Sequence, residues 1–147
     1  MSPRRTANSE VGMTLVEVVV ALSISGLAVG AIVSGYLFSA TSAENSALSL
    51  AANARAMERI EETRSAKWDT ASSPAVDELI SSNFPDKVIT LDLSGSGSGI
   101  TYATNLTQIS MVSTSPPLKR IRVDCVWSFK GSRLLTNTIE TCRAPDQ

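Results

Sequence analysis

Residues 18–38 read VVVALSISGLAVGAIVSGYLF, a run without a single charged side chain. A helix of this length rises about 30 Å at roughly 1.5 Å per residue, which matches the hydrocarbon thickness of a bilayer. The polar residues 1–10 precede the run and include Arg4 and Arg5. Basic residues ahead of an apolar run stay on the cytoplasmic side. The sequence therefore predicts one N-terminal membrane helix, with the rest of the chain exported.

Three kinds of N-terminal segment are compatible with this pattern. A secretory signal peptide would end at the small residues 41–43, although its apolar region is usually only about 7–15 residues long and has no reason to contain an acid such as Glu17. A plain membrane anchor is the second alternative. The third depends on the residues just before the apolar run.

Residues 11–18 read VGMTLVEV and closely resemble the processing site of type IV prepilins and type II secretion pseudopilins. In that family a basic leader ends in Gly, a membrane aspartyl protease cuts behind it and methylates the new N-terminus, and Glu is the fifth residue of the mature chain. The resemblance implies that residues 1–12 are a cleaved leader, that the cut falls between Gly12 and Met13, and that Met13 is N-methylated. The chain most resembles minor pseudopilin I and similar minor pilins.

Glu17 is the acidic residue of this motif. A carboxylate in a membrane helix costs about 2.5–3.5 kcal/mol at the bilayer centre and less near the interface, so it is a functional candidate by default. The resemblance implies that Glu17 pairs with the amino group of Met13 in a neighbouring subunit and sets the register of assembly. The alternative is a side chain that merely reaches the lipid headgroups.

Three glycines lie in the apolar run, at Gly26, Gly30 and Gly35. Gly26 and Gly30 have the small-xxx-small spacing that lets a second helix approach closely in lipid. All three glycines are also the candidates for the helix softening that many family members obtain from a proline. Glycine is, however, frequent in membrane helices in general.

The helix is expected to continue beyond the membrane, because residues 39–67 lack Pro and Gly and are rich in helix formers. We expect a transmembrane half over 13–38 and an amphipathic periplasmic half over 39–69, ending near Trp68 or Asp69. The stripe expected to pack on a sheet consists of Ala47, Leu50, Ala54, Met57 and Ile60.

The remaining residues, 70–147, are expected to form a periplasmic antiparallel β domain. Residues 70–86 suggest a loop or a short helical connection, and after Pro85 the apolar residues alternate with polar ones. Four or so strands are readable, and their pairing stays open. The clearest strand places five residues on one face, namely Ile121, Val123, Cys125, Trp127 and Phe129. The fold class is therefore α+β and pilin-like, with one long helix packed on a small sheet.

Cys125 and Cys142 are candidates for a disulfide, because an exported domain lies in an oxidising compartment and the family often ties down its C-terminal loop in this way. A simple hairpin centred on Gly131 places Cys125 opposite Asn137 and Cys142 opposite Arg120. The two sulfurs would then be roughly 17 Å apart along the strand. A disulfide needs Cα atoms within about 7 Å. The sequence therefore leaves open whether these cysteines form a disulfide or remain free thiols.

Composition argues against an enzyme or a metalloprotein. The chain has no histidine, a formal net charge of −1 and two cysteines without a C-x-x-C motif. No cofactor, metal site or catalytic residue is expected. Basic residues near the last hairpin offer a DNA-uptake pilin as an alternative, although nucleic acid is not the expected partner: Lys119, Arg120, Arg122, Lys130 and Arg133.

The function expected from the resemblance is that of a structural subunit of a type II secretion pseudopilus or a type IV pilus. Its partners would be prepilin peptidase, other pilin or pseudopilin subunits and an inner-membrane assembly platform. The N-terminus would be cytoplasmic, and the C-terminal domain periplasmic before it joins the filament. A signal-anchored periplasmic protein unrelated to filaments is the remaining alternative.

Overall fold

The computed structural model describes residues 13–91, 100–130 and 133–146. They form a long N-terminal helix followed by a four-stranded antiparallel sheet, so the α+β class is confirmed. The chain divides into two compact units, one ending at Ser42 and one beginning at Ala43. The elements are α1 (Leu15–Arg64), β1 (Trp68–Asp69), β2 (Val76–Asp77), the 3₁₀ helix η1 (Ser81–Asn83), β3 (Lys87–Thr90), β4 (Tyr102–Thr114), β5 (Pro117–Phe129) and β6 (Arg133–Arg143).

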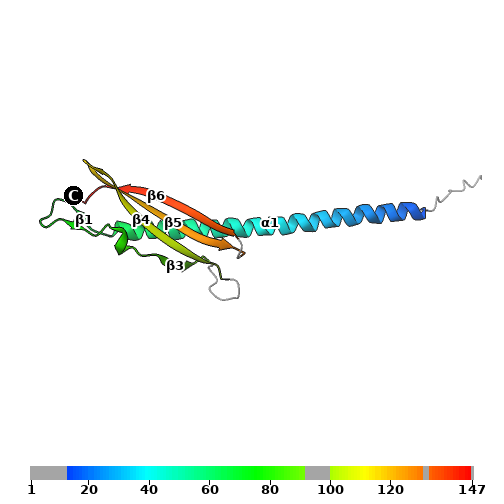
Figure 1. Ribbon diagram of the computed structural model, residues 1–147. Helices are drawn as coiled ribbons and strands as arrows, with labels where there is room; N and C mark the ends of the chain where they lie inside the picture. The colour runs from blue at the N-terminus through cyan, green and yellow to red at the C-terminus, as the bar shows by residue number, and fades with distance from the viewer. Residues whose placement is uncertain (1–12, 92–99, 131–132, 147) are drawn as a thin grey trace, which may run out of the picture. The chain divides into compact units, whose positions relative to one another are not determined.

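The sheet is a meander in which the strands follow the order β3-β4-β5-β6, and Figure 1 shows them side by side along the later part of α1. The hairpin of β5 and β6 has the expected register, because Cys125 pairs with Asn137 and Arg120 pairs with Cys142. Gly131, the expected centre of the turn, lies outside the described residues, as does the loop at 92–99.

The core of the second unit lies between α1 and the inner face of the sheet. The strand residues expected there are confirmed, since Ile121, Val123, Cys125 and Trp127 are at most 2% exposed. Phe129 is only half-buried at the end of the same face. The helix contributes Leu48, Ala52, Ala56 and Ile60, while Trp68, Leu79, Leu91 and Ala103 complete the buried cluster.

The predicted helix stripe is wrong except at Ile60. Leu50 and Met57 are 71% and 50% exposed, and Ala47 and Ala54 are exposed as well. The buried face of α1 also carries two polar residues, Arg59 and Thr63, whose side chains are hydrogen-bonded. Periodicity weighs apolar character alone, and the bulk of this core comes from the sheet rather than from the helix.

The end of α1 also differs from the expectation. The helix ends at Arg64, and Trp68 and Asp69 form a strand instead. Ser65 and Ala66 donate to the carbonyls of Glu62 and Thr63, so the last turn tightens into 3₁₀-type bonding. Trp68 then pairs with Asp77 in the two-stranded β1–β2 hairpin, whose second strand lies in the segment 70–86 that was expected to be a loop or a short helical connection.

Candidate functional site

The first turn of α1 is the place where the sequence motif meets the structure. Thr14 is the N-cap, because its carbonyl accepts the first intrahelical bond from Val18 at 3.2 Å. Its Oγ1 accepts a hydrogen bond from the backbone N–H of Glu17 at 3.3 Å. This arrangement supplies a partner to one of the amides that a helix start otherwise leaves unpaired. Met13 lies just before the cap and is 70% exposed, whereas Gly12 lies outside the described residues.

Glu17 occupies the third position after this cap, which the sequence analysis missed. The spacing Thr14-x-x-Glu17 is the pattern of a capping box, in which an acid or amide stands three residues after a hydroxyl cap. A carboxylate in the first turn is also stabilised by the positive end of the helix dipole. The Glu17 side chain is exposed and has no ion-pair partner within the described ranges. The motif is thus both a helix start signal and a solvent-facing charge.

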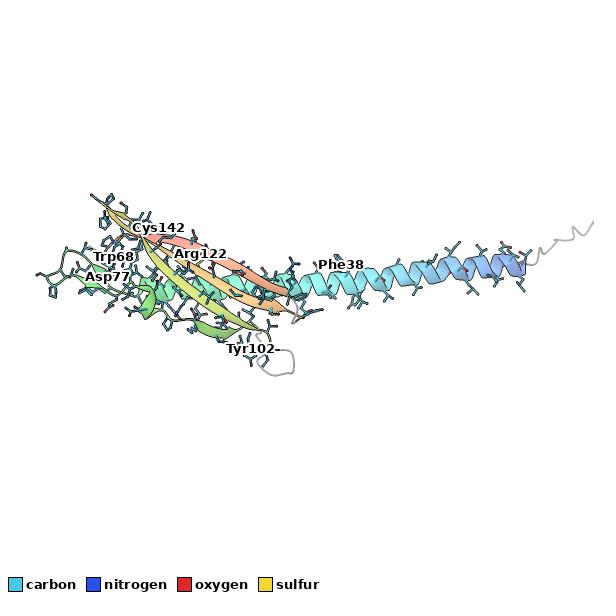
Figure 2. The ribbon with its side chains drawn as sticks, in the orientation of Figure 1. Phe38, Trp68, Asp77, Tyr102, Arg122 and Cys142 are labelled. Carbon is cyan, nitrogen blue, oxygen red and sulfur yellow. The ribbon has the colours of Figure 1, made fainter. Side chains whose placement is uncertain are left out.

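The apolar part of α1 is exposed all round. Leu15, Leu27 and Phe38 are 81%, 76% and 77% exposed, and Phe38 is labelled on the helix in Figure 2. A Cβ built at Gly26 or Gly30 meets nothing within 4 Å, and the same holds at Gly35. Among the described residues there is one helix, α1, that is long enough and apolar enough to cross a membrane.

A serine within this apolar stretch is hydrogen-bonded inside the helix. Ser23 donates its hydroxyl to the carbonyl of Val19 at 2.8 Å. Such back-bonding gives the hydroxyl a partner where lipid has none. The serine is therefore compatible with a segment surrounded by hydrocarbon.

The second unit holds a buried cation on α1. Arg59 is 7% exposed and donates to Thr107 Oγ1 at 3.0 Å and to the carbonyl of Pro85 at 2.6 Å. It also pairs with Glu62, which accepts a further bond from Lys87 at 2.7 Å. The bond from Lys87, followed by that from Arg59, lowers the pKa of Glu62. These contacts join α1 to β4, to β3 and to the segment just before β3.

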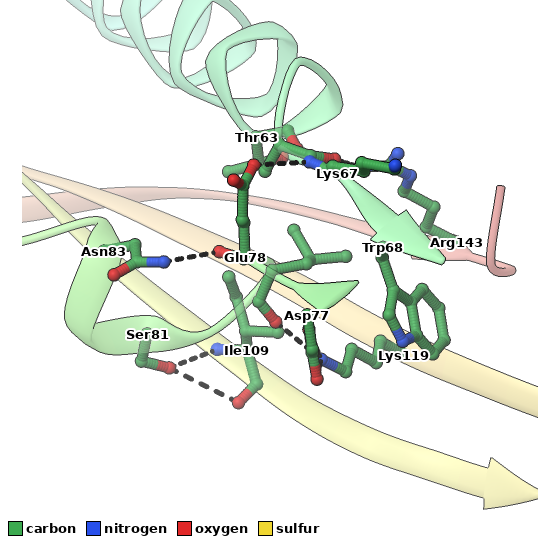
Figure 3. A network of polar contacts seen from close by, with 12 residues as sticks. Thr63, Lys67, Trp68, Asp77, Glu78, Ser81, Asn83, Ile109, Lys119 and Arg143 are labelled. Carbon is green, nitrogen blue, oxygen red and sulfur yellow. Dashed lines mark hydrogen bonds and ion pairs between the residues drawn. The ribbon is translucent and has the colours of Figure 1, made fainter. Parts of the chain in front are cut away.

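A second buried cation, Lys119 near the start of β5, lies beside β1 and β2, as Figure 3 shows. Lys119 is 5% exposed, and its Nζ lies 2.6 Å from both carboxylate oxygens of Asp77 and 2.7 Å from the carbonyl of Leu79. The same Nζ lies 4.8 Å from the ring centroid of Trp68. Lys119 thereby holds the β1–β2 hairpin against β5.

The five basic residues expected near the last hairpin do not form one surface. Lys119 lies on the inner face and is paired, and Lys130 pairs with Glu44 at 3.3 Å. Arg122 lies 2.9 Å from the carboxylate of Asp124, which is only 9% exposed. Three of the five basic residues thus already have an acidic partner, which reduces the positive charge available to a DNA phosphate backbone.

The two cysteines are free thiols at different levels of the β5–β6 hairpin. Cys125 is fully buried, and burial raises its pKa to about 11. Cys142 is exposed on β6 and is labelled in Figure 2. No bridge joins them in this fold.

Groups suited to hold a metal are absent from the described residues, where no three His, Cys, Asp or Glu side chains gather. A cavity of about 370 Å³ lies between α1 and β3, with Arg55, Glu62, Lys87 and Tyr102 among its lining residues. Asn105 also lines it, and its buried Oδ1 has no partner among the described residues.

Comparison of the chain with protein-family models, with curated proteins and with solved structures finds no match.

Proposed function

We propose that this chain is a pilin-like subunit that is processed at the Gly12–Met13 bond and assembles into a filament through its apolar helix. The observation that carries the proposal is the position of the motif relative to α1. The residues of the resemblance, Met13 to Glu17, coincide with the start of a 50-residue helix whose apolar part is exposed on all sides. A prepilin needs its processing site in that position.

The chemistry of the helix surface supports the same proposal. Contiguous apolar surface of this extent is rare on a soluble monomer and needs either lipid or other helices as its environment. An apolar helix is suited to both environments, first to lipid and then to neighbouring helices, when a subunit moves from the membrane into a filament. The glycines at Gly26 and Gly30 leave open space beside the backbone, into which a neighbouring helix fits.

In this role Glu17 acts in assembly and not in catalysis. Its carboxylate lies one turn from the N-terminus that cleavage behind Gly12 would create. A neighbouring subunit offers the ammonium of its own Met13 as the partner, and a desolvated pair of that kind selects geometry more than it adds stability. The subunit would be held in the inner membrane with its sheet domain in the periplasm.

The test is to express the full chain with and without a prepilin peptidase and to determine the N-terminal sequence and intact mass of the membrane-bound product. We expect a chain that starts at Met13 and carries one added methyl group, only when the peptidase is present. Gly12→Leu should block this conversion, whereas Gly26→Leu serves as the control that leaves the cleavage site intact. A product that begins near Glu44 without the peptidase would refute the proposal and indicate an ordinary signal peptide.

A further inference from the structure

The C-terminal tail, residues 143–146, lies across the end of α1. The guanidinium of Arg143 donates from Nη1 to the carbonyls of Thr63 and Ala66, at 3.1 and 2.8 Å. Carbonyls at a helix end lack intrahelical partners, and a cation there also meets the negative end of the helix dipole. A residue at the end of β6 therefore caps a helix that ends about 80 residues earlier, as Figure 3 shows for Thr63 and Arg143.

The same tail pairs with β1 through Asp146. Its backbone N–H donates to the carbonyl of Trp68 at 2.7 Å, and the Trp68 N–H donates to Asp146 Oδ2 at 2.9 Å. The other carboxylate oxygen of Asp146 accepts from Arg143 at 2.6 Å. Arg143 and Asp146 thus bond to each other and to consecutive parts of one target, the segment from Thr63 to Trp68.

These contacts are polar, and they range from partly buried to exposed. The side chains of Arg143 and Asp146 are 17% and 41% exposed, and no residue of 143–146 belongs to the apolar core. Segments with few buried apolar contacts open at lower free energy than the core on which they rest.

We propose that residues 143–146 form a strap that closes over the end of α1 and β1 and opens while the four-stranded sheet stays folded. Closing needs α1, β1 and β6 in their final positions, because the strap contacts all three. Opening frees the N–H and carbonyl of Trp68 and removes Arg143 from the carbonyls of Thr63 and Ala66, while the Thr63 carbonyl keeps its bond from the Ala66 N–H. The strap is thus a conformational device at the end of the domain, and none of its residues belongs to the membrane helix.

Electrostatics favour the closed strap. The hydrogen bond from the Trp68 amide, followed by that from Arg143, holds the pKa of Asp146 below its usual value. Lys67, beside Trp68, is the other cation that acts on this carboxylate. Asp146 therefore stays ionised at neutral pH and keeps both of its bonds charge-assisted.

The test is hydrogen–deuterium exchange of the full-length protein in detergent micelles, resolved to single amides. Asp146→Ala removes the acceptor of the Trp68 N–H, so we expect the Trp68 amide to exchange about ten-fold faster or more, while the amides of β4 and β5 keep their rates. Arg143→Gln should accelerate the same amide. Asp86→Ala removes an exposed carboxylate outside the strap and should leave it unchanged.

Two results would overturn the proposal. An unchanged Trp68 amide in both strap variants would mean that the tail does not protect this segment. A parallel acceleration of the β4 and β5 amides in Asp146→Ala would mean that the tail opens only with the whole domain.

Discussion

Replacing Lys119 by methionine tests whether this buried cation holds the β1–β2 hairpin. The ammonium lies 2.6 Å from the carboxylate of Asp77 and 2.7 Å from the carbonyl of Leu79, and the side chain is only 6% exposed. Methionine keeps a flexible apolar chain of similar length and removes the charge and all three donors. The substitution therefore isolates the polar contacts from the packing of the stem.

The magnitude follows from what each partner loses. The Asp77 side chain is 44% exposed, so water replaces much of its lost bond. Leu79 is fully buried, and an unpaired buried carbonyl costs about 1–3 kcal/mol. Loss of the cation–π contact with Trp68 adds roughly 0.5–1 kcal/mol. We expect the free energy of unfolding to fall by about 1.5–4 kcal/mol in total.

Urea unfolding of the full-length protein in micelles, followed by tryptophan fluorescence, measures this change, because Trp68 and Trp127 are both buried. The matched control is Lys130→Met, whose ion pair with Glu44 is about half exposed on both sides. A surface pair of this kind is worth roughly 0.2–1 kcal/mol. If the two variants differ by less than about 0.5 kcal/mol, the reasoning about the buried carbonyl is refuted.

Three further predictions concern the helix face, the thiols and acid stability. Ala56→Leu should lower the free energy of unfolding in urea by about 1–3 kcal/mol because the site is fully buried, whereas Leu50→Gln should change it by less than about 0.5 kcal/mol. A larger effect of Leu50→Gln than of Ala56→Leu would favour the stripe expected from the sequence. Native protein should take up one maleimide, at Cys142, and a second at Cys125 only in denaturant; mass spectra without reductant should show no internal bridge. The pKa of Glu62 is lowered in the folded state, so its contribution to stability is present at pH values above the usual carboxyl pKa and is lost as pH falls through the folded-state pKa. Urea titrations should therefore show that Glu62→Gln is less stable at pH 7 and that its stability depends less on acid pH.

The strands of the four-stranded sheet were predictable from the sequence because local alternation determines them, whereas the short strands β1 and β2 were not. The pairing of Cys125 with Asn137 followed from one turn and a count of residues, and the structure has that register. The start of α1 is also marked in the sequence by the capping-box spacing of Thr14 and Glu17, a signal that the sequence analysis did not use.

The helix face and the far end of the domain were not predictable in this way. Arg59 and Thr63 lie on the buried side of α1 because partners distant in sequence, such as Thr107, satisfy them. Lys119 and Arg143 similarly act on segments about 40 and 80 residues away. A single sequence carries no local signal for such contacts, so charged residues there look like an ordinary solvent-facing surface.

The Thr14 cap has a consequence for the balance of charge at the start of α1. After the proposed cleavage behind Gly12, the ammonium of Met13 would lie beside a helix end that already carries about half a positive charge. Glu17 supplies the opposite charge within the same turn. Glutamine is accepted at this capping position but carries no charge, and alanine supplies neither function. If filament assembly fails in both Glu17→Gln and Glu17→Ala, the role of Glu17 depends on its charge. If assembly fails in Glu17→Ala alone, its role is to cap the start of the helix.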